Sequence, residues 1–135
     1  MLNRMVRTHV ANVMRPSILP NLVEAASRNE ARGFSDQSLF EVGPQYLSPE
    51  VNGQEWVATC IRFGRIGTRD WRKTYRECDL YDAKADATAS LDGMGVQVEK
   101  LRSNTDAPPW YHPGRSGTLV YGSKKIILAN FGELH

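Results

Sequence analysis

Cysteine, histidine and long apolar runs are scarce in this sequence, and each scarcity excludes a class of protein. Two cysteines, Cys60 and Cys78, are too few and too far apart to form the disulfide framework of a small secreted domain. No apolar run approaches the roughly 20 residues that a transmembrane helix needs, and the first ten residues lack the apolar core of a secretory signal. The sequence therefore predicts a cytoplasmic protein with reduced thiols and no membrane partner.

Patterns typical of metal sites are also missing. His112 has no partner at a zinc-ligand spacing, because His9 and His135 both lie far from it in the sequence. Asp82 and Asp86 would suit acid–base chemistry or Mg²⁺, but no third set of ligands accompanies them. A helix dipole favours carboxylates at its N-terminal end, and this structural interpretation is preferred. We predict no metal, no cofactor and no catalytic residue for this chain.

What is present is the composition of one soluble globular domain. The chain has 135 residues, of which 41% are hydrophobic and 24% are charged, with a net charge of +2. A chain of this length buries about two-thirds of its unfolded surface, so a real core is expected. Residues 1–12 lack periodicity and are predicted to be a lead-in to a module that spans residues 13–135. The chain stops directly after a strand-like run, which predicts a module truncated at its C-terminal end.

The first half of the chain predicts a helix followed by a hairpin. Ser17 suits a helix cap, Pro20 suits the first turn, and an apolar face continues to about Arg32, with Gly33 as the stop. A strand is expected over residues 39–42, ending at Gly43-Pro44, with Tyr46 extending it after the break. Turn residues at 48–53 then lead to a second strand over residues 56–64, which should pair antiparallel with the first.

The second half predicts one more helix and three strands. Asp79 suits the cap of a helix over residues 80–93. Strands are expected over residues 96–101, 118–121 and 125–132, with the last two forming a hairpin. Short turns between strands, with helices interspersed, predict an α+β fold: a mostly antiparallel sheet flanked by helices.

A run rich in proline and glycine, residues 108–117, separates the last predicted hairpin from the strand before it. Prolines and glycines predict a shaped loop that fastens two elements together. The residues predicted to form this structural lock are Trp110, Tyr111, His112, Arg115 and Ser116. We expect His112 to be structural and Arg115 to form a buried pair with a carboxylate. Its candidate partners are Glu41, Asp82, Asp86 and Glu133.

One segment, from Arg62 to Arg76, is locally basic and contains two interleaved aromatic residues. Such a segment can hold a phosphate backbone or stack bases, and Arg69, Arg72 and Lys73 are the candidate contacts. The alternative is a solvated loop that balances an acidic surface on a partner subunit, and this is the preferred interpretation.

Five motifs, in this order, resemble the β subunit of bacterial phenylalanyl-tRNA synthetases. They are Val13-Met14-Arg15-Pro16-Ser17-Ile18-Leu19-Pro20-Asn21-Leu22, Leu39-Phe40-Glu41-Val42-Gly43-Pro44, Tyr81-Asp82-Ala83-Lys84-Ala85-Asp86, Trp110-Tyr111-His112-Pro113-Gly114-Arg115-Ser116 and Phe131-Gly132-Glu133-Leu134-His135. The resemblance covers residues 13–135 and is to the catalytic-like module of that subunit. It implies a class II synthetase fold in a module that has lost the chemistry and packs on the catalytic α subunit.

The resemblance also implies where the chemistry is absent. A working class II site has an arginine for the ATP phosphate after the strand that resembles Leu39 to Tyr46, and here that position is Leu47. A neutral side chain cannot stabilise charge that develops on a transferred nucleotidyl group. The third class II motif would lie beyond His135. ATP and Mg²⁺ are therefore expected only in the α subunit of the complete enzyme.

The partners that the resemblance implies are the α subunit, the other modules of the β chain, and tRNA in the complete enzyme. Arg69, Arg72 and Lys73 are then candidate tRNA contacts. The helix start is expected near the subunit interface, with Arg15, Pro16, Leu19, Pro20 and Leu22 as candidate contacts. A surface meant for the α subunit would be exposed in the isolated chain, which we expect to self-associate.

Overall fold

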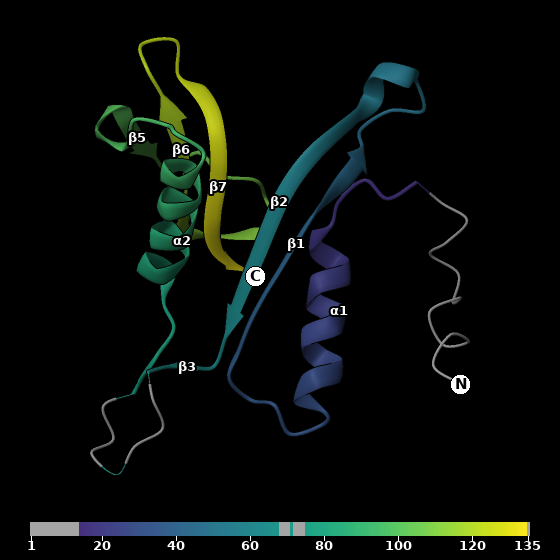
Figure 1. The fold of residues 1–135 in the computed structure, drawn as a ribbon, viewed down its shortest axis with the longest axis vertical. Coiled ribbons are helices and arrows are strands. Elements are labelled where there is room, and N and C mark those ends of the chain that lie inside the picture. Colours follow the sequence, from purple (N-terminus) through teal and green to yellow (C-terminus); the bar gives the residue numbers. More distant parts are fainter. Residues whose placement is uncertain (1–13, 68–70, 72–74, 135) are drawn as a thin grey trace. The chain divides into compact units, whose positions relative to one another are not determined.

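A computed structural model describes residues 14–67, 71 and 75–134 of the chain. The chain divides into two compact units, Met1–Gly67 and Thr68–His135, which are described separately. In Figure 1 the first unit runs from purple to teal and the second from green to yellow. Within the described residues, neither helix has the length and apolar character needed to cross a membrane.

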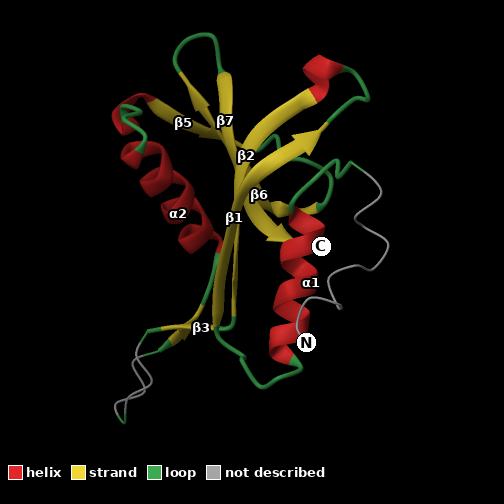
Figure 2. Ribbon diagram, turned by 45° about the vertical axis from the view of Figure 1, so that its right-hand side comes forward, coloured by secondary structure: helices red, strands yellow, loops and turns green. Residues whose placement is uncertain are grey.

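The first unit is a helix on a two-stranded antiparallel hairpin. It contains α1 (Leu19–Glu30), β1 (Gln37–Tyr46), the 3₁₀ turn η2 (Val51–Gly53), β2 (Gln54–Phe63) and the short β3 (Arg65–Ile66). β1 and β2 pair without a break from Gln37↔Phe63 to Tyr46↔Gln54, and α1 packs on both strands (Figure 2). The predicted hairpin is confirmed, but Gly43-Pro44 does not end the first strand. Pro44 lies within β1 and pairs with Trp56.

The predicted cap of α1 is wrong by one residue, because Ile18 and not Ser17 occupies the cap position. The Leu19 amide donates to the Ser17 hydroxyl at 3.2 Å, and a proline occupies the first turn. At the other end the Gly33 amide donates to the Glu30 carbonyl at 2.8 Å and the Phe34 amide to the Asn29 carbonyl at 3.1 Å. This bonding pattern needs a left-handed residue, and Gly33 supplies it with φ +90°.

The second unit places one helix on a three-stranded antiparallel sheet. Its elements are β4 (Arg76–Glu77), α2 (Leu80–Gly93), the 3₁₀ turn η3 (Val98–Lys100), β5 (Leu101–Asn104), β6 (Tyr111–Tyr121) and β7 (Ile126–Leu134). The sheet order is β5-β6-β7, with β6 antiparallel to both neighbours. Leu91 of α2, Leu119 of β6 and Phe131 of β7 form the buried core of this unit. The α+β class, with antiparallel strands and flanking helices, is thus confirmed.

The prediction of a strand over residues 96–101 is wrong for all but its last residue, because β5 spans Leu101–Asn104. After α2 the Gly95 amide donates to the Asp92 carbonyl at 2.8 Å, and the Val96 amide donates to the Leu91 carbonyl at 3.0 Å. These bonds end the helix with Gly95 at φ +84°, so Val96 belongs to the helix stop and η3 follows it. The strand therefore begins only at Leu101.

Candidate functional site

Two motifs separated in the sequence meet where α1 begins and β1 ends. The Arg15 guanidinium pairs with the Glu41 carboxylate at 2.5 Å and donates from Nε to the Pro44 carbonyl at 3.0 Å. Gly43 lies directly beneath, because a Cβ there would come within 2.6 Å of Arg15 Nη2. We call Arg15, Glu41, Gly43 and Pro44 the Arg15 cluster. Its pair is only partly exposed, so it fixes the start of α1 against the strand end more firmly than a surface pair would.

Among the acids proposed for Arg115, the structure places Glu133 against it. Arg115 Nη1 lies 3.1 Å and 3.0 Å from the two carboxylate oxygens of Glu133. The expectation of a buried pair is wrong, since the two side chains are 60% and 51% exposed. Glu41 is engaged by Arg15 instead, and Asp82 by Arg76. An exposed pair of this kind contributes about 0–1 kcal/mol, so Arg115 is not a buried anchor.

The loop predicted over residues 108–117 is wrong from Tyr111 onward, where the chain forms a bulged strand, while residues 108–110 lie outside any strand. β6 begins at Tyr111, which pairs with Leu134, and regular pairing resumes at Ser116, opposite Gly132. Residues 112–115 therefore stand opposite Glu133 alone. A bulge of this size accommodates Pro113, which lacks a backbone donor, within a strand.

Side chains within this bulge bond to its own backbone and press on β7. The Ser116 hydroxyl donates to the His112 carbonyl at 2.9 Å, and the Gly114 amide donates to His112 Nδ1 at 3.2 Å. A Cβ on Gly132 would lie 2.6 Å from Ser116 Cβ and 2.8 Å from Tyr111 Cδ1, so only glycine permits this approach. The Trp110 and Tyr111 rings lie beside each other, with centroids 6.1 Å apart. These contacts are of the kind that a structural lock between β6 and β7 requires.

The N-terminal end of α2 carries a network of one arginine and two aspartates. Asp79 caps the helix as predicted and accepts from the Tyr81 and Asp82 amides at 2.8 Å and 3.2 Å. Asp82 accepts from the Asp79 amide at 2.8 Å, which completes a reciprocal capping box. Arg76 holds both Asp82 oxygens, at 2.7 Å and 2.5 Å. This hydrogen bonding from Arg76, reinforced by the Asp79 amide, holds the pKa of the Asp82 carboxyl far below its ordinary value.

The lowered pKa of Asp82 predicts a specific acid sensitivity. A depressed carboxyl pKa adds stability that is complete above the unfolded pKa of about 4 and is lost as pH falls toward the folded pKa. Asp82→Asn should therefore be less stable than the parent chain at pH 7, and the two should converge toward pH 2. Thermal unfolding between pH 7 and pH 2 checks this. Asp92→Asn, at the far end of α2, is the matched control, and equal pH slopes for the parent and Asp82→Asn would contradict the assignment.

The candidate contacts for partners differ in accessibility. Pro16 and Pro20 are exposed, while Arg15 and Leu19 are half-buried. Leu22 is only 6% exposed, so it is corrected from a candidate subunit contact to a core residue. Arg69, Arg72 and Lys73 lie outside the described residues.

Leu47 follows β1 directly, and its side chain is 67% exposed. Its amide donates to the Gly53 carbonyl at 2.8 Å, which closes the turn toward β2. The position that the family resemblance aligns with the class II arginine is thus an exposed alkyl side chain. Among the described residues, no group of three or more His, Cys, Asp or Glu side chains is placed to hold a metal ion.

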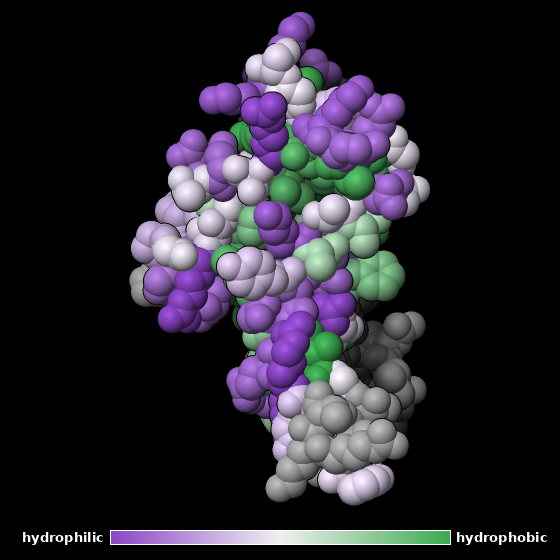
Figure 3. Space-filling view, turned by 90° about the vertical axis from the view of Figure 1, so that its left-hand side faces the viewer, coloured by the Kyte–Doolittle hydropathy of each residue, from purple (hydrophilic) through white to green (hydrophobic). Residues whose placement is uncertain are grey.

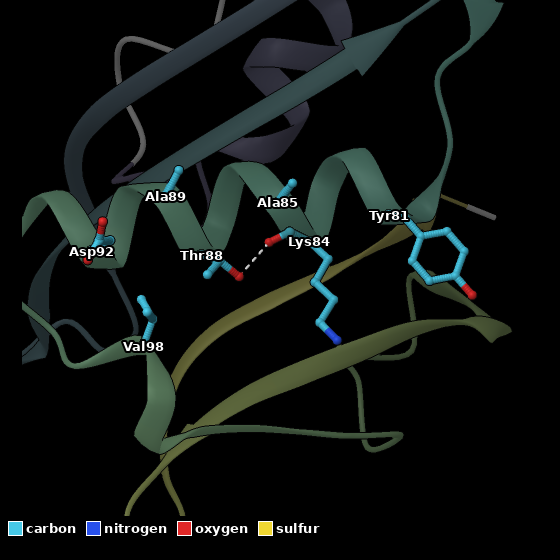
Figure 4. Close-up of a pocket in the computed structure, with 7 residues that line it drawn as sticks. All are labelled: Tyr81, Lys84, Ala85, Thr88, Ala89, Asp92 and Val98. Carbon is cyan, nitrogen blue, oxygen red and sulfur yellow. Dashed lines mark hydrogen bonds between the residues drawn. The ribbon is translucent and has the colours of Figure 1, made fainter.

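A shallow hollow of about 430 Å³ lies along α2. It is lined by Tyr81, Lys84, Ala85, Thr88, Ala89, Asp92 and Val98. In Figure 4 the Thr88 hydroxyl bonds to the Lys84 carbonyl, at 2.8 Å. The Lys84 ammonium lies 6.0 Å from the centre of the Phe131 ring and 3.4 Å from the Ser103 hydroxyl. The Lys84 side chain therefore packs against the sheet. The residues that line the hollow include no nucleophile paired with a base, which covalent catalysis would need.

The surface seen from the side on which α2 lies in Figure 1 is mixed in character. Figure 3 shows an apolar area in its upper half, bordered by hydrophilic residues. In Figure 4 the polar residues that line the hollow are spread along α2 from Tyr81 to Asp92, whereas the polar groups of a typical small-molecule site converge on one point.

Comparison with known proteins gives one consistent result. Residues 7–135 match the family described as the phenylalanyl tRNA synthetase beta chain CLM domain. The chain is 48% identical over 124 residues to the phenylalanine–tRNA ligase beta subunit of Rhodospirillum rubrum, covering 92% of this chain and 15% of that protein. It is 48% identical over 134 residues to the beta subunit of Paramagnetospirillum magneticum, covering 94% of this chain and 16% of the relative. The chain thus spans about a sixth of the length of these relatives.

Proposed function

The chain belongs to the family of the phenylalanyl-tRNA synthetase β-chain CLM domain, and from this membership we propose that it is a structural, non-catalytic module of a phenylalanine–tRNA ligase. In this role it packs on the catalytic α subunit and joins the other modules of the β chain to it. The complete ligase attaches phenylalanine to tRNA with ATP and Mg²⁺, and these bind in the α subunit. The setting is the cytoplasm.

The observation that carries the proposal is Leu47. It stands exposed after β1, where the family resemblance calls for an arginine on the ATP phosphate. Transfer of a nucleotidyl group requires positive charge or donors aimed at the developing oxyanion, and an alkyl side chain supplies neither. The antiparallel strands and flanking helices of both units support the assignment to a class II synthetase-like fold.

The residues of the five motifs support a structural role. Arg15 and Glu41 fasten α1 to β1, and Tyr111 and Ser116 close on Gly132 to fasten β6 to β7. Both contacts join residues of this chain to one another. Such contacts preserve the shape of a scaffold that must present a fixed surface to a partner.

Measurement of phenylalanine-dependent ATP–pyrophosphate exchange tests the proposal. The pure chain should show no exchange above a protein-free blank, because it lacks a phosphate-binding cation at position 47. The complete ligase of a relative, assayed in parallel, shows that the conditions support exchange. Measurable exchange by the pure chain, surviving repeated purification, would overturn the non-catalytic assignment.

A further inference from the structure

The tip of the β1–β2 hairpin carries the single Asn-Gly pair of the sequence, Asn52-Gly53. The pair lies in the 3₁₀ turn η2, which Figure 2 shows as the short red helix that joins β1 to β2. Asparagine is among the chemically labile residues. A glycine after it leaves the next backbone nitrogen unhindered, because glycine has no Cβ. The pair therefore places an electrophilic side-chain amide beside an accessible backbone nitrogen.

The reaction open to this pair is intramolecular deamidation. The Gly53 nitrogen attacks Asn52 Cγ and gives up its proton, the Cγ–Nδ2 bond breaks, and ammonia leaves behind a cyclic succinimide. Water then opens the ring. Addition of water at Cγ gives aspartate, whereas addition at the main-chain carbonyl carbon gives isoaspartate, in which the backbone runs through Cβ and Cγ. Water is the only co-reactant that these steps require.

The closed turn holds the attacking nitrogen in a conformation that does not react. The Gly53 amide donates to the Glu50 carbonyl at 2.9 Å, and the Leu47 amide donates to the Gly53 carbonyl at 2.8 Å. Ring closure also requires Cβ of Asn52 and the Gly53 nitrogen to be eclipsed about the Cα–C bond. The ψ of a 3₁₀ turn, about −20 to −30°, does not eclipse them. Both hydrogen bonds must therefore break before the ring can form.

Packing within the turn requires the glycine that makes the pair labile. A Cβ on Gly53 would overlap the hydroxyl and carbonyl oxygens of Ser48, and it would come within 2.9 Å of the Ser48 amide nitrogen. Any other residue at this position would force the turn apart. The fold therefore needs the reactive dipeptide, and the closed turn protects it.

The isoaspartate product does not fit the closed turn. Regular pairing of the two strands begins directly beside the turn, with Tyr46 opposite Gln54. Isoaspartate lengthens the backbone between these paired residues, and the tight contact of Gly53 with Ser48 leaves no room for the extra length. The bond from the Leu47 amide to the Gly53 carbonyl is then lost. Formation of isoaspartate therefore keeps the tip of the hairpin open.

We propose that Asn52 is a site of spontaneous deamidation controlled by the turn at the hairpin tip. The closed turn protects Asn52, opening of the turn allows the succinimide to form, and the isoaspartate product prevents the turn from closing again. Local opening requires less free energy than global unfolding. The folded chain therefore reacts at a rate set by the fraction of time that the tip is open. This modification does not depend on the proposed ligase role.

Peptide mass spectrometry of the whole chain, incubated in mildly alkaline buffer, tests the proposal by following the loss of the Asn52 amide. The native chain should react at least about tenfold more slowly than the chain unfolded in guanidinium chloride, because the turn must open first. Leu47→Pro removes the amide that donates to Gly53, and it should speed the native reaction about fivefold. Leu47→Ala keeps that amide and is the matched control, which should react at the parent rate.

Each part of the proposal has an outcome that overturns it. Equal rates in the native and unfolded chains would overturn control by the turn, and this comparison stands even if Leu47→Pro does not fold. An Asn52 amide that survives in the unfolded chain would overturn the site itself. The purified isoaspartate product should show faster hydrogen exchange than the parent chain at the Leu47 and Gly53 amides. Unchanged exchange at both amides would overturn the claim that the product holds the tip open.

Discussion

Replacing Phe131 with alanine is expected to lower the free energy of unfolding of the 68–135 unit by about 3–5 kcal/mol. The Phe131 ring is 7% exposed and packs with Leu91 and Leu119 in the core of this unit. It also fills the space beside Gly117, where a Cβ would come within 2.8 Å of the ring. Removing the ring leaves a cavity between α2 and the sheet that these neighbours cannot close. Urea denaturation of the whole chain, followed by circular dichroism, measures the change.

The matched control for Phe131 lies on the same strand. Ile127 is 64% exposed, so Ile127→Ala should change the free energy of unfolding by about 0.5 kcal/mol or less. A loss below about 1 kcal/mol in Phe131→Ala would mean that this core does not hold the unit together. A loss in Ile127→Ala as large as in Phe131→Ala would mean that β7 is covered in solution.

Local chemistry accounts for the elements that the sequence predicts well. The predicted bounds of α2 match the structure because Asp79 and Asp82 cap its start and Gly95 ends it within a few residues. The end of α1 is similarly local, since Gly33 supplies the left-handed turn. In each case the deciding contacts lie within five residues of the boundary, which is the range that a sequence pattern can represent.

The bulge in β6 could not be predicted from the same kind of rule. Pro113 and Gly114 argue against a regular strand, but the backbone of this segment is held by pairing with β7 on either side of the bulge. The partner of Tyr111 is Leu134, more than 20 residues away, and its identity depends on the turn and register between them. Local propensity correctly marks an irregularity here but not its position inside a sheet.

The Arg15–Glu41 pair is a contact that the sequence analysis did not predict, although both residues lie in motifs that it identified. Arg15 and Glu41 are 26 residues apart, and nothing in spacing alone pairs them. Both belong to motifs of the family resemblance, however, and Gly43 in the second motif marks a close approach of another group. A glycine beside a carboxylate in one motif and an arginine in another is a signal that would have found the pair. It would also have removed Glu41 from the partners considered for Arg115.

The two motif clusters have a shared physical purpose. Gly43 and Gly132 each lie where a Cβ would collide with a neighbouring side chain, at 2.6 Å in both cases. A close approach of this kind fixes the position of one element on the next. It does not place a reactive side chain beside a substrate. The residues that identify the family therefore maintain shape, which is consistent with a module whose work is to present a surface.

Replacing Ile18 with alanine is expected to destabilise the other unit by about 3 kcal/mol. Ile18 is fully buried, and its Cδ1 lies 3.8 Å from the position that a Cβ on Gly43 would occupy. Alanine keeps the backbone of the helix start, where the Ile18 carbonyl accepts from the Asn21 and Leu22 amides at 3.1 Å and 3.3 Å. The loss is therefore one of packing between α1 and the hairpin. Hydrogen exchange should show faster exchange at the amides of α1, β1 and β2.

Val23→Ala is the control on the same helix, because Val23 is 41% exposed and its truncation should cost about 0.5 kcal/mol or less. A loss in Ile18→Ala no larger than in Val23→Ala would mean that this contact does not hold α1 on the hairpin.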